Sequence, residues 1–167
     1  MAWNIGLTVS KTGPEESYVN VFHMHDFLLF LHSWVRWIAI VGGVLATVTA
    51  LSSVDAKQNR WGLIFTIALD VQFVLGLLLL LTSSALGNMG DTMRDPTARF
   101  YAVEHPTIMV LAIALAHVGR VTARKATSAA SARTKSIIFF GLSTLLLLGG
   151  TPWPGTHDNR ALFNVTP

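Results

Sequence analysis

The sequence predicts an all-α integral membrane protein, a four-helix up-down bundle, and three observations support this fold class. Four apolar stretches fill most of the 167-residue chain, at 27–51, 61–83, 100–121 and 136–151. A helix needs about 20 apolar residues to cross a hydrocarbon core of about 30 Å, and these stretches reach or approach that length. The apolar residues run continuously instead of alternating, which favours helices over barrel strands. Hydrophobic residues make up 51% of the chain and charged residues only 13%.

The first predicted helix, 27–51, follows a polar segment, 1–26, that contains no apolar core. Such a segment is not a cleavable signal peptide, so we expect the first helix itself to direct insertion. His32 and Arg36 are four residues apart and share one face of this helix. The His-Met-His-Asp run at 23–26 is a candidate copper or zinc site at the outer surface, although this spacing is short and common.

The second and third predicted helices each have a distinctive polar feature. Asp70 is the one ionisable residue within 61–83. Before 100–121, Asp95 and Pro96 form the pattern of an N-cap followed by proline at the first helical position. The third helix therefore starts at Pro96 and carries Pro106 as an internal kink, or it starts at Pro106 after an entry turn.

The fourth predicted helix, 136–151, includes Gly149 and Gly150 near its end and is stopped by the Thr-Pro-Trp-Pro run at 151–154. Residues 132–136 are expected to form its interfacial turn. The chain thus divides into an outer N-terminal segment (1–26), the bundle (27–151) and an outer C-terminal tail (152–167).

The charges of the loops predict the orientation of the bundle. The first and third loops together carry seven Lys and Arg residues, and the middle loop carries two. The positive-inside rule places the first and third loops in the cytoplasm. Both termini then lie outside, in the periplasm of a bacterial inner membrane. The basic balance of the chain reflects these loops, so it does not indicate nucleic-acid binding. The absence of cysteine excludes disulfides and thiolate metal sites.

His32 and His105 are predicted at matching depths on two parallel helices. His32 lies about 7 Å below the outer boundary and His105 about 4 to 8 Å below it. Two imidazoles at one level of a bundle are the arrangement that ligates haem iron from both faces. Arg36, one turn deeper, would then pair with a haem propionate or with Glu104. The alternative is two interfacial histidines, with Arg36 and Glu104 as a structural clasp.

Asp70 and His117 form a second, looser depth match. Asp70 lies about 13 Å from the cytoplasmic start of its helix, and His117 lies about one turn from the cytoplasmic end of the third helix. They are predicted to form a buried polar pair, either structural or as a step in a proton path. Gln72 is rotated by about 200° from Asp70, so it is expected to meet a different neighbour.

Four segments together resemble small four-helix bacterial membrane proteins that are labelled cytochrome-b-like or uncharacterised. The segments are HSWVRW at 32–37, DVQ at 70–72, FYAVEHP at 100–106 and AHVGR at 116–120. The resemblance spans about residues 28–154. It implies a small bundle that carries b-type haem or accompanies a respiratory or photosynthetic complex. The positions where such a role would fall are His32, Arg36, Glu104 and His105.

Two functions stay open from the sequence, and a third has weaker support. The first is electron transfer by a haem b ligated by His32 and His105, with a quinone and other membrane subunits as partners besides lipid. The second is a non-catalytic accessory subunit that stabilises a larger membrane complex. The third is a proton or ion conduit through Asp70 and His117. Nucleotide-binding and hydrolase motifs are absent, so we expect no catalytic activity of its own.

Overall fold

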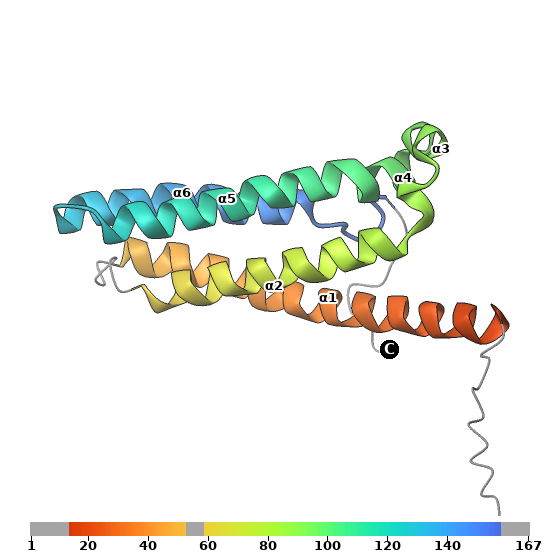
Figure 1. Ribbon diagram of the computed structural model, residues 1–167. Helices are drawn as coiled ribbons and strands as arrows, with labels where there is room; N and C mark the ends of the chain where they lie inside the picture. Colours follow the sequence, from red (N-terminus) through yellow and green to blue (C-terminus); the bar gives the residue numbers. More distant parts are fainter. Residues whose placement is uncertain (1–13, 53–58, 158–167) are drawn as a thin grey trace, which may run out of the picture.

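Four long helices form the molecule, which confirms the predicted all-α bundle. The computed structural model describes residues 14–52 and 59–157. Within these residues no strand occurs, and the long helices run alternately up and down (Figure 1). They are α1 (Pro14–Leu51), α2 (Arg60–Thr82), α5 (His105–Arg124) and α6 (Ala129–Gly150).

Four helical stretches are long and apolar enough to cross a membrane, as an integral membrane protein requires. They are Met24–Leu51, Arg60–Thr82, Pro96–Arg124 and Ala129–Gly150. Only 22% to 33% of the residues in their apolar windows are buried inside the protein. Most of the apolar surface therefore faces outward, where a soluble protein would place polar side chains and a membrane protein meets lipid.

α1 begins well before the predicted residue 27. It starts at Pro14 and has 38 residues, so it is about 57 Å long and exceeds the hydrocarbon core of a bilayer. In Figure 1 its first part extends beyond the end of the bundle. The apolar pattern marks only the portion suited to lipid, because a helix continues into water wherever its polar residues support it. Residues 1–13 lie outside the described part of the chain.

The third membrane stretch starts at Pro96, so the first of the two predicted alternatives is correct. The Asp95 carboxylate accepts a hydrogen bond from the Ala98 backbone N–H at 2.8 Å, as an N-cap does. After α3 (Met89–Arg94), the stretch runs through α4 (Pro96–Arg99), a π-helical turn (Phe100–Glu104) and α5 without interruption.

The π-helical turn accommodates Pro106. Proline has no N–H, and its ring clashes with the carbonyl four residues earlier in an α-helix. The wider turn lets the His105 N–H bond to the carbonyl of Phe100, five residues back. The extra residue in this turn rotates α5 relative to the segment before it.

The middle of the bundle is held by two buried phenylalanine rings. Phe65 on α2 and Phe140 on α6 are 0% and 1% exposed, and their ring centres lie 6.2 Å apart in an edge-to-face contact. A Cβ on Gly62 would lie 2.5 Å from the Phe140 ring, so only glycine allows α2 and α6 to come this close. On the neighbouring side, the Ser143 hydroxyl donates to the Ala112 carbonyl at 2.7 Å and ties α6 to α5.

α6 begins at Ala129, earlier than the predicted residue 136, because Ser128 caps it by accepting from the Ser131 N–H. After α6 the chain turns back over one end of the bundle, and we call residues 151–157 the return segment. The Trp153 indole donates to the Leu148 carbonyl at 2.9 Å and packs edge-to-face on Trp37. This end of the bundle is called the tail end below.

Candidate functional site

His32 and His105 meet across the centre of the bundle at its tail end. Each long helix packs against two others in the ring order α1–α2–α5–α6, so α1 and α5 lie diagonally opposite. The two imidazole ring centres are 6.3 Å apart and the ring planes cross at 72°. Both side chains are half-buried. The depth match between these two histidines therefore corresponds to direct proximity in space.

The orientation of His105 is fixed by the end of α6. Its Nδ1 lies 2.7 Å from the carbonyl oxygen of Gly150. A carbonyl only accepts, so this bond requires the proton on Nδ1 and leaves Nε2 with a free lone pair. Gly150 reaches α5 because it has no side chain: a Cβ there would lie 2.5 Å from Met109 and 2.7 Å from Ile108. Metal-bound histidines commonly make such a bond through their second nitrogen.

His32 lies against α2, where Gly76 leaves room for its ring. A Cβ on Gly76 would come within 3.3 Å of the Cε1 atom of His32. The Nδ1 of His32 and the Oε1 of Gln72 are both buried, and neither has a hydrogen-bond partner among the described residues. A buried polar atom without a partner costs about 1–3 kcal/mol. Two such atoms beside the histidine pair indicate a place where a ligand or an ordered water belongs.

Arg36 lies close to the histidine pair, and Glu104 does not join it. The Arg36 guanidinium stands 5.7 Å from the ring centre of Trp37, and Arg36 follows His32 by one turn of α1. The Glu104 carboxylate instead accepts from Arg99 Nε at 2.7 Å, and both of these side chains are half-exposed. The predicted clasp between Arg36 and Glu104 is therefore wrong, because the π-helical turn directs Glu104 toward Arg99 on the rim.

Two aromatic residues at the site were not anticipated from the sequence. Phe100, in the π-helical turn, lies 5.9 Å from His105 between ring centres. His157 of the return segment stacks on the Phe100 ring with 3.5 Å between ring centres, and its carbonyl accepts from the Thr97 hydroxyl at 2.9 Å. The return segment thus covers the aromatic wall of the site. No spacing in the sequence indicates these contacts, and the glycine pair that ends α6 indicates only a helix stop.

The two imidazoles of this site suit a metal ion that receives its other ligands from outside the protein chain. The ring centres lie 6.3 Å apart in an edge-to-face arrangement, an ordinary distance for packed aromatic rings that is also compatible with two imidazoles sharing one metal at about 2 Å per bond. Within the described residues, no group of three or more His, Cys, Asp or Glu side chains is placed to hold a metal. A metal with two protein ligands takes its remaining donors from water or from a cofactor, and a porphyrin is one cofactor that supplies four nitrogens.

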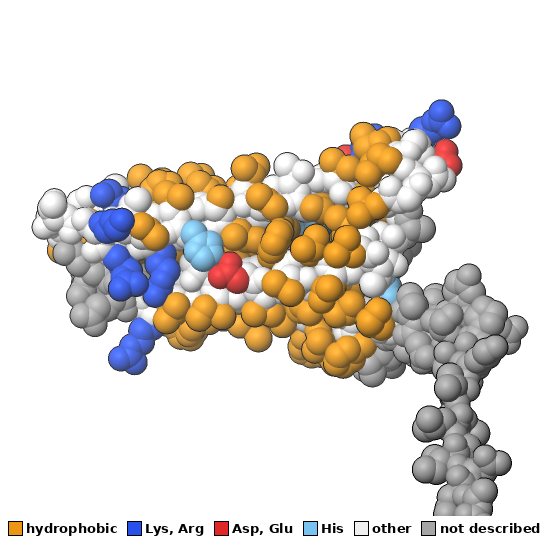
Figure 2. All heavy atoms as spheres, viewed as in Figure 1, with side chains coloured by type: hydrophobic (Ala, Val, Ile, Leu, Met, Phe, Trp, Pro, Cys, Tyr) orange, Lys and Arg blue, Asp and Glu red, His pale blue; other side chains and the backbone are white. Residues whose placement is uncertain are grey.

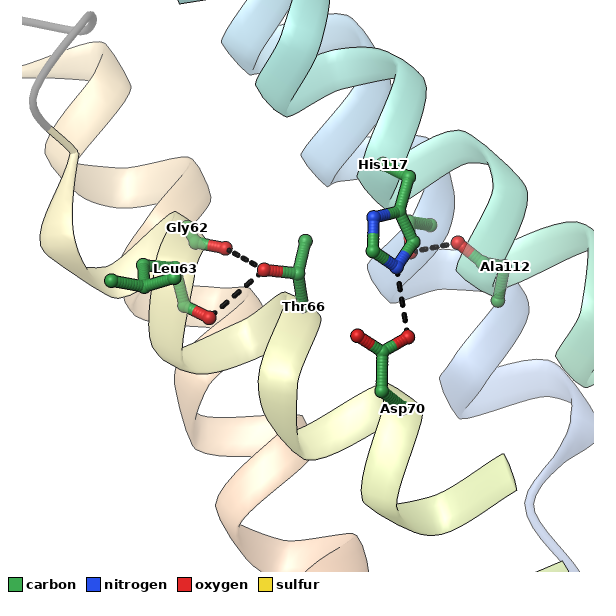
Figure 3. A network of polar contacts seen from close by, with 7 residues as sticks. Gly62, Leu63, Thr66, Asp70, Ala112 and His117 are labelled. Atoms are coloured by element: carbon green, nitrogen blue, oxygen red, sulfur yellow. Dashed lines mark hydrogen bonds and ion pairs between the residues drawn. The ribbon is translucent and has the colours of Figure 1, made fainter. Parts of the chain in front are cut away.

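Asp70 and His117 form the predicted pair, but the pair is not buried. The His117 Nε2 and the Asp70 Oδ1 are 2.8 Å apart, linking α2 to α5 (Figure 3). Their side chains are 46% and 51% exposed, so the expectation of burial is wrong. The core-facing residues of this turn of α2 are Ala68 and Leu69, which turns Asp70 outward. Thr66, one turn away, bonds to carbonyls of its own helix and does not join the pair.

The His-Met-His-Asp run at 23–26 lies in α1, near the tail end. The His25 Nδ1 is 3.1 Å from the Thr82 hydroxyl, which joins α1 to the end of α2. The side chain of His23 lies outside the described part of the structure. A copper or zinc site here stays a prediction.

Comparisons with protein families, with curated proteins and with solved structures give no match to this chain. The site geometry and the membrane fold therefore carry the functional argument.

Proposed function

We propose that this protein is a membrane-embedded b-type cytochrome that binds one haem between His32 and His105. The observation that carries the proposal is the approach of these two imidazoles from diagonal helices, at a ring separation suited to one shared metal ion. A haem held by these two histidines would supply one-electron redox chemistry.

Each surrounding residue has a defined task in this proposal. His105 presents its unprotonated Nε2, because its Nδ1–H is held by the Gly150 carbonyl. His32 approaches from the opposite side in the space that Gly76 leaves. Arg36 supplies a fixed positive charge that offsets a propionate carboxylate in a medium of low dielectric. Phe100 lies against the His105 ring and restricts the access of water to it. A site with less water stabilises a charge on the bound group less well.

We further propose a bacterial inner membrane location, with both termini periplasmic and the site near the outer leaflet. Arg and Lys side chains gather at the end of the bundle opposite the histidine site (Figure 2). The positive-inside rule assigns such an end to the cytoplasm. A quinol in the bilayer and a periplasmic acceptor are the redox partners that this location favours.

The test is the visible spectrum of the full-length protein, purified in mild detergent after expression with haem supply. We expect a reduced-minus-oxidised spectrum of a six-coordinate b-type haem, with about one haem per chain by pyridine haemochrome. Replacing His32 or His105 with Ala should abolish this spectrum, because each variant lacks one of the two imidazoles that would hold the haem.

His117→Ala is the matched control, since it removes a histidine from the same bundle at a distance from the site. Its spectrum should equal that of the unmodified protein. A colourless protein, or a His32→Ala variant with an unchanged spectrum, would show that the proposal is wrong.

The second candidate function is the non-catalytic accessory subunit. One observation favours it, namely the half-exposed Asp70–His117 pair on an outward surface, which points to a neighbouring protein. The same spectrum separates the two candidates, because an accessory subunit without haem is colourless.

A further inference from the structure

The outward pair lies on the surface made by α2 and α5, between the Lys and Arg side chains at one end of the bundle and a largely hydrophobic area on the other side (Figure 2). Asp70 is about 15 Å along α2 from its start, so it is well inside a hydrocarbon core of about 30 Å. On the face shown in Figure 2, an acidic and a histidine side chain lie next to each other among hydrophobic side chains. Their exposed apolar neighbours within about one or two turns are Ile67, Val71, Val74, Val110 and Val121.

Facing lipid would be unfavourable for this pair. Ionisable residues in membrane helices almost always face a bundle interior or a water-filled cavity. The bond between His117 Nε2 and Asp70 Oδ1 satisfies one atom of each residue. The described residues offer no partner to the second carboxylate oxygen of Asp70 or to Nδ1 of His117. In hydrocarbon, such polar atoms need a partner from another molecule.

The chemistry of the pair selects a second copy of this chain as that partner. Beside the internal bond, Asp70 keeps one carboxylate oxygen as a hydrogen-bond acceptor, and His117 keeps Nδ1, a ring nitrogen that donates in one of its tautomers. The two residues lie beside each other at one depth, on neighbouring helices. A twofold axis along the membrane normal preserves depth and orientation, so it brings each donor to the acceptor of the other copy.

We infer that the protein forms a homodimer through the α2–α5 face, in which Asp70 of each copy pairs with the partner's His117. The inference goes beyond the proposed function and does not depend on haem. The polar atoms of the two pairs then bind one another and are shielded from lipid. The apolar side chains around them supply the packing surface.

The first experiment uses the absence of cysteine from the chain. A Val74→Cys variant carries one thiol, one turn from Asp70 at a position that is 54% exposed. The matched control is Leu145→Cys, on the outward side of α6 and 64% exposed. In bilayers at high lipid-to-protein ratio, a thiol cross-linker should join Val74→Cys chains into dimers at least about tenfold more efficiently than Leu145→Cys chains.

The second experiment exchanges the two residues in an Asp70→His/His117→Asp variant. The exchanged chain still has one Asp and one His that bind each other within the chain. Two exchanged chains can also still place each Asp opposite the partner's His. A mixed dimer would place carboxylate against carboxylate and imidazole against imidazole, which is unfavourable. When differently tagged original and exchanged chains are produced together, like pairs should exceed mixed pairs by about tenfold or more over the statistical ratio.

A merely structural role of the pair within one chain does not predict this sorting. Statistical mixing of the two tagged chains would overturn the inference, and so would cross-linking at Leu145→Cys equal to that at Val74→Cys. Absence of any dimer of the purified original protein would also overturn it, and would leave the face to a different subunit. If the exchanged chain does not accumulate as a folded protein, the cross-linking result decides alone.

Discussion

At the scale of single residues, the orientation of His105 depends on a backbone atom, the carbonyl oxygen of Gly150. The Gly150 carbonyl accepts from Nδ1 of His105 at 2.7 Å, and the missing Cβ of Gly150 allows this approach. Gly149, one residue earlier, has open space instead, because a Cβ added there would meet no atom within 4 Å. Two adjacent glycines therefore differ sharply in what they do.

Replacing Gly150 with Ala should destabilise the protein and disturb His105. The new Cβ would overlap Ile108 and Met109, and overpacking of this kind costs about 1–3 kcal/mol. Gly149→Ala is the control and should be neutral or slightly stabilising, because alanine is the better helix former. The free energy of unfolding in a denaturing-detergent titration measures both. Equal stability of the two variants would contradict the packing around Gly150.

At the scale of elements, close approach at small residues holds the helices together. Gly62 brings α2 against the Phe140 ring, which is 1% exposed and has no free space to move into. Helix packing in membranes relies on such contacts, because lipid removes most of the hydrophobic driving force between helices. Glycine positions where an added methyl group would clash, such as Gly62, thus set the distances between the packed helices.

Gly62→Ala should lower the free energy of unfolding by about 1–3 kcal/mol, which outweighs the gain of up to about 1 kcal/mol from better helix propensity. Gly141→Ala is the matched control, since its Cβ would meet only Thr47 at an ordinary 3.8 Å. The control should show the propensity gain alone. Thermal unfolding followed by circular dichroism in detergent distinguishes the two, and a stabilised Gly62→Ala protein would refute the contact.

The lengths of the membrane helices were predictable from the sequence, and their rotations were not. Length follows from continuous apolar composition, which a bilayer requires. Rotation in soluble helices is read from alternating apolar and polar faces, but here the lipid-facing and core-facing residues are equally apolar. The matching depths of Asp70 and His117 were therefore predictable from the sequence. The outward orientation of the pair was not predictable.

The π-helical turn was missed for a related reason. Pro106 predicted an irregularity in the third stretch, but its form depends on how the chain satisfies the carbonyls around it. The wider turn at Phe100–Glu104 then decided that Glu104 meets Arg99. A register change of one residue rotates everything before it by about 100°, which sequence spacing does not reveal.

At the scale of the whole molecule, the two polar sites lie toward different ends of the bundle. His105 and His117 are twelve positions apart on α5, which is about 18 Å along the helix axis. The histidine site faces the interior of the bundle, and the Asp70–His117 pair faces outward. The proposed cofactor site and the proposed association surface therefore lie in separate parts of one small bundle.

The predicted orientation is tested by reporter fusions. A fusion after Lys125 lies in the basic turn before α6, and a fusion after Pro167 follows the return segment. Because α6 separates these points as a membrane stretch, the two reporters should report opposite sides, with Lys125 cytoplasmic under the positive-inside rule. Reporters on the same side would contradict the spanning role of α6.

The most direct measurement of the central claim is electron paramagnetic resonance of the oxidised, purified protein at low temperature. In a haem held by His32 and His105, the angle between the imidazole planes would set the splitting between two iron d orbitals, and near-perpendicular planes would keep these orbitals close in energy. The angle of 72° between His32 and His105 therefore predicts a low-spin ferric signal of strong anisotropy with a dominant low-field feature. The absence of a ferric haem signal, or a high-spin signal from iron with a single histidine ligand, would contradict the account.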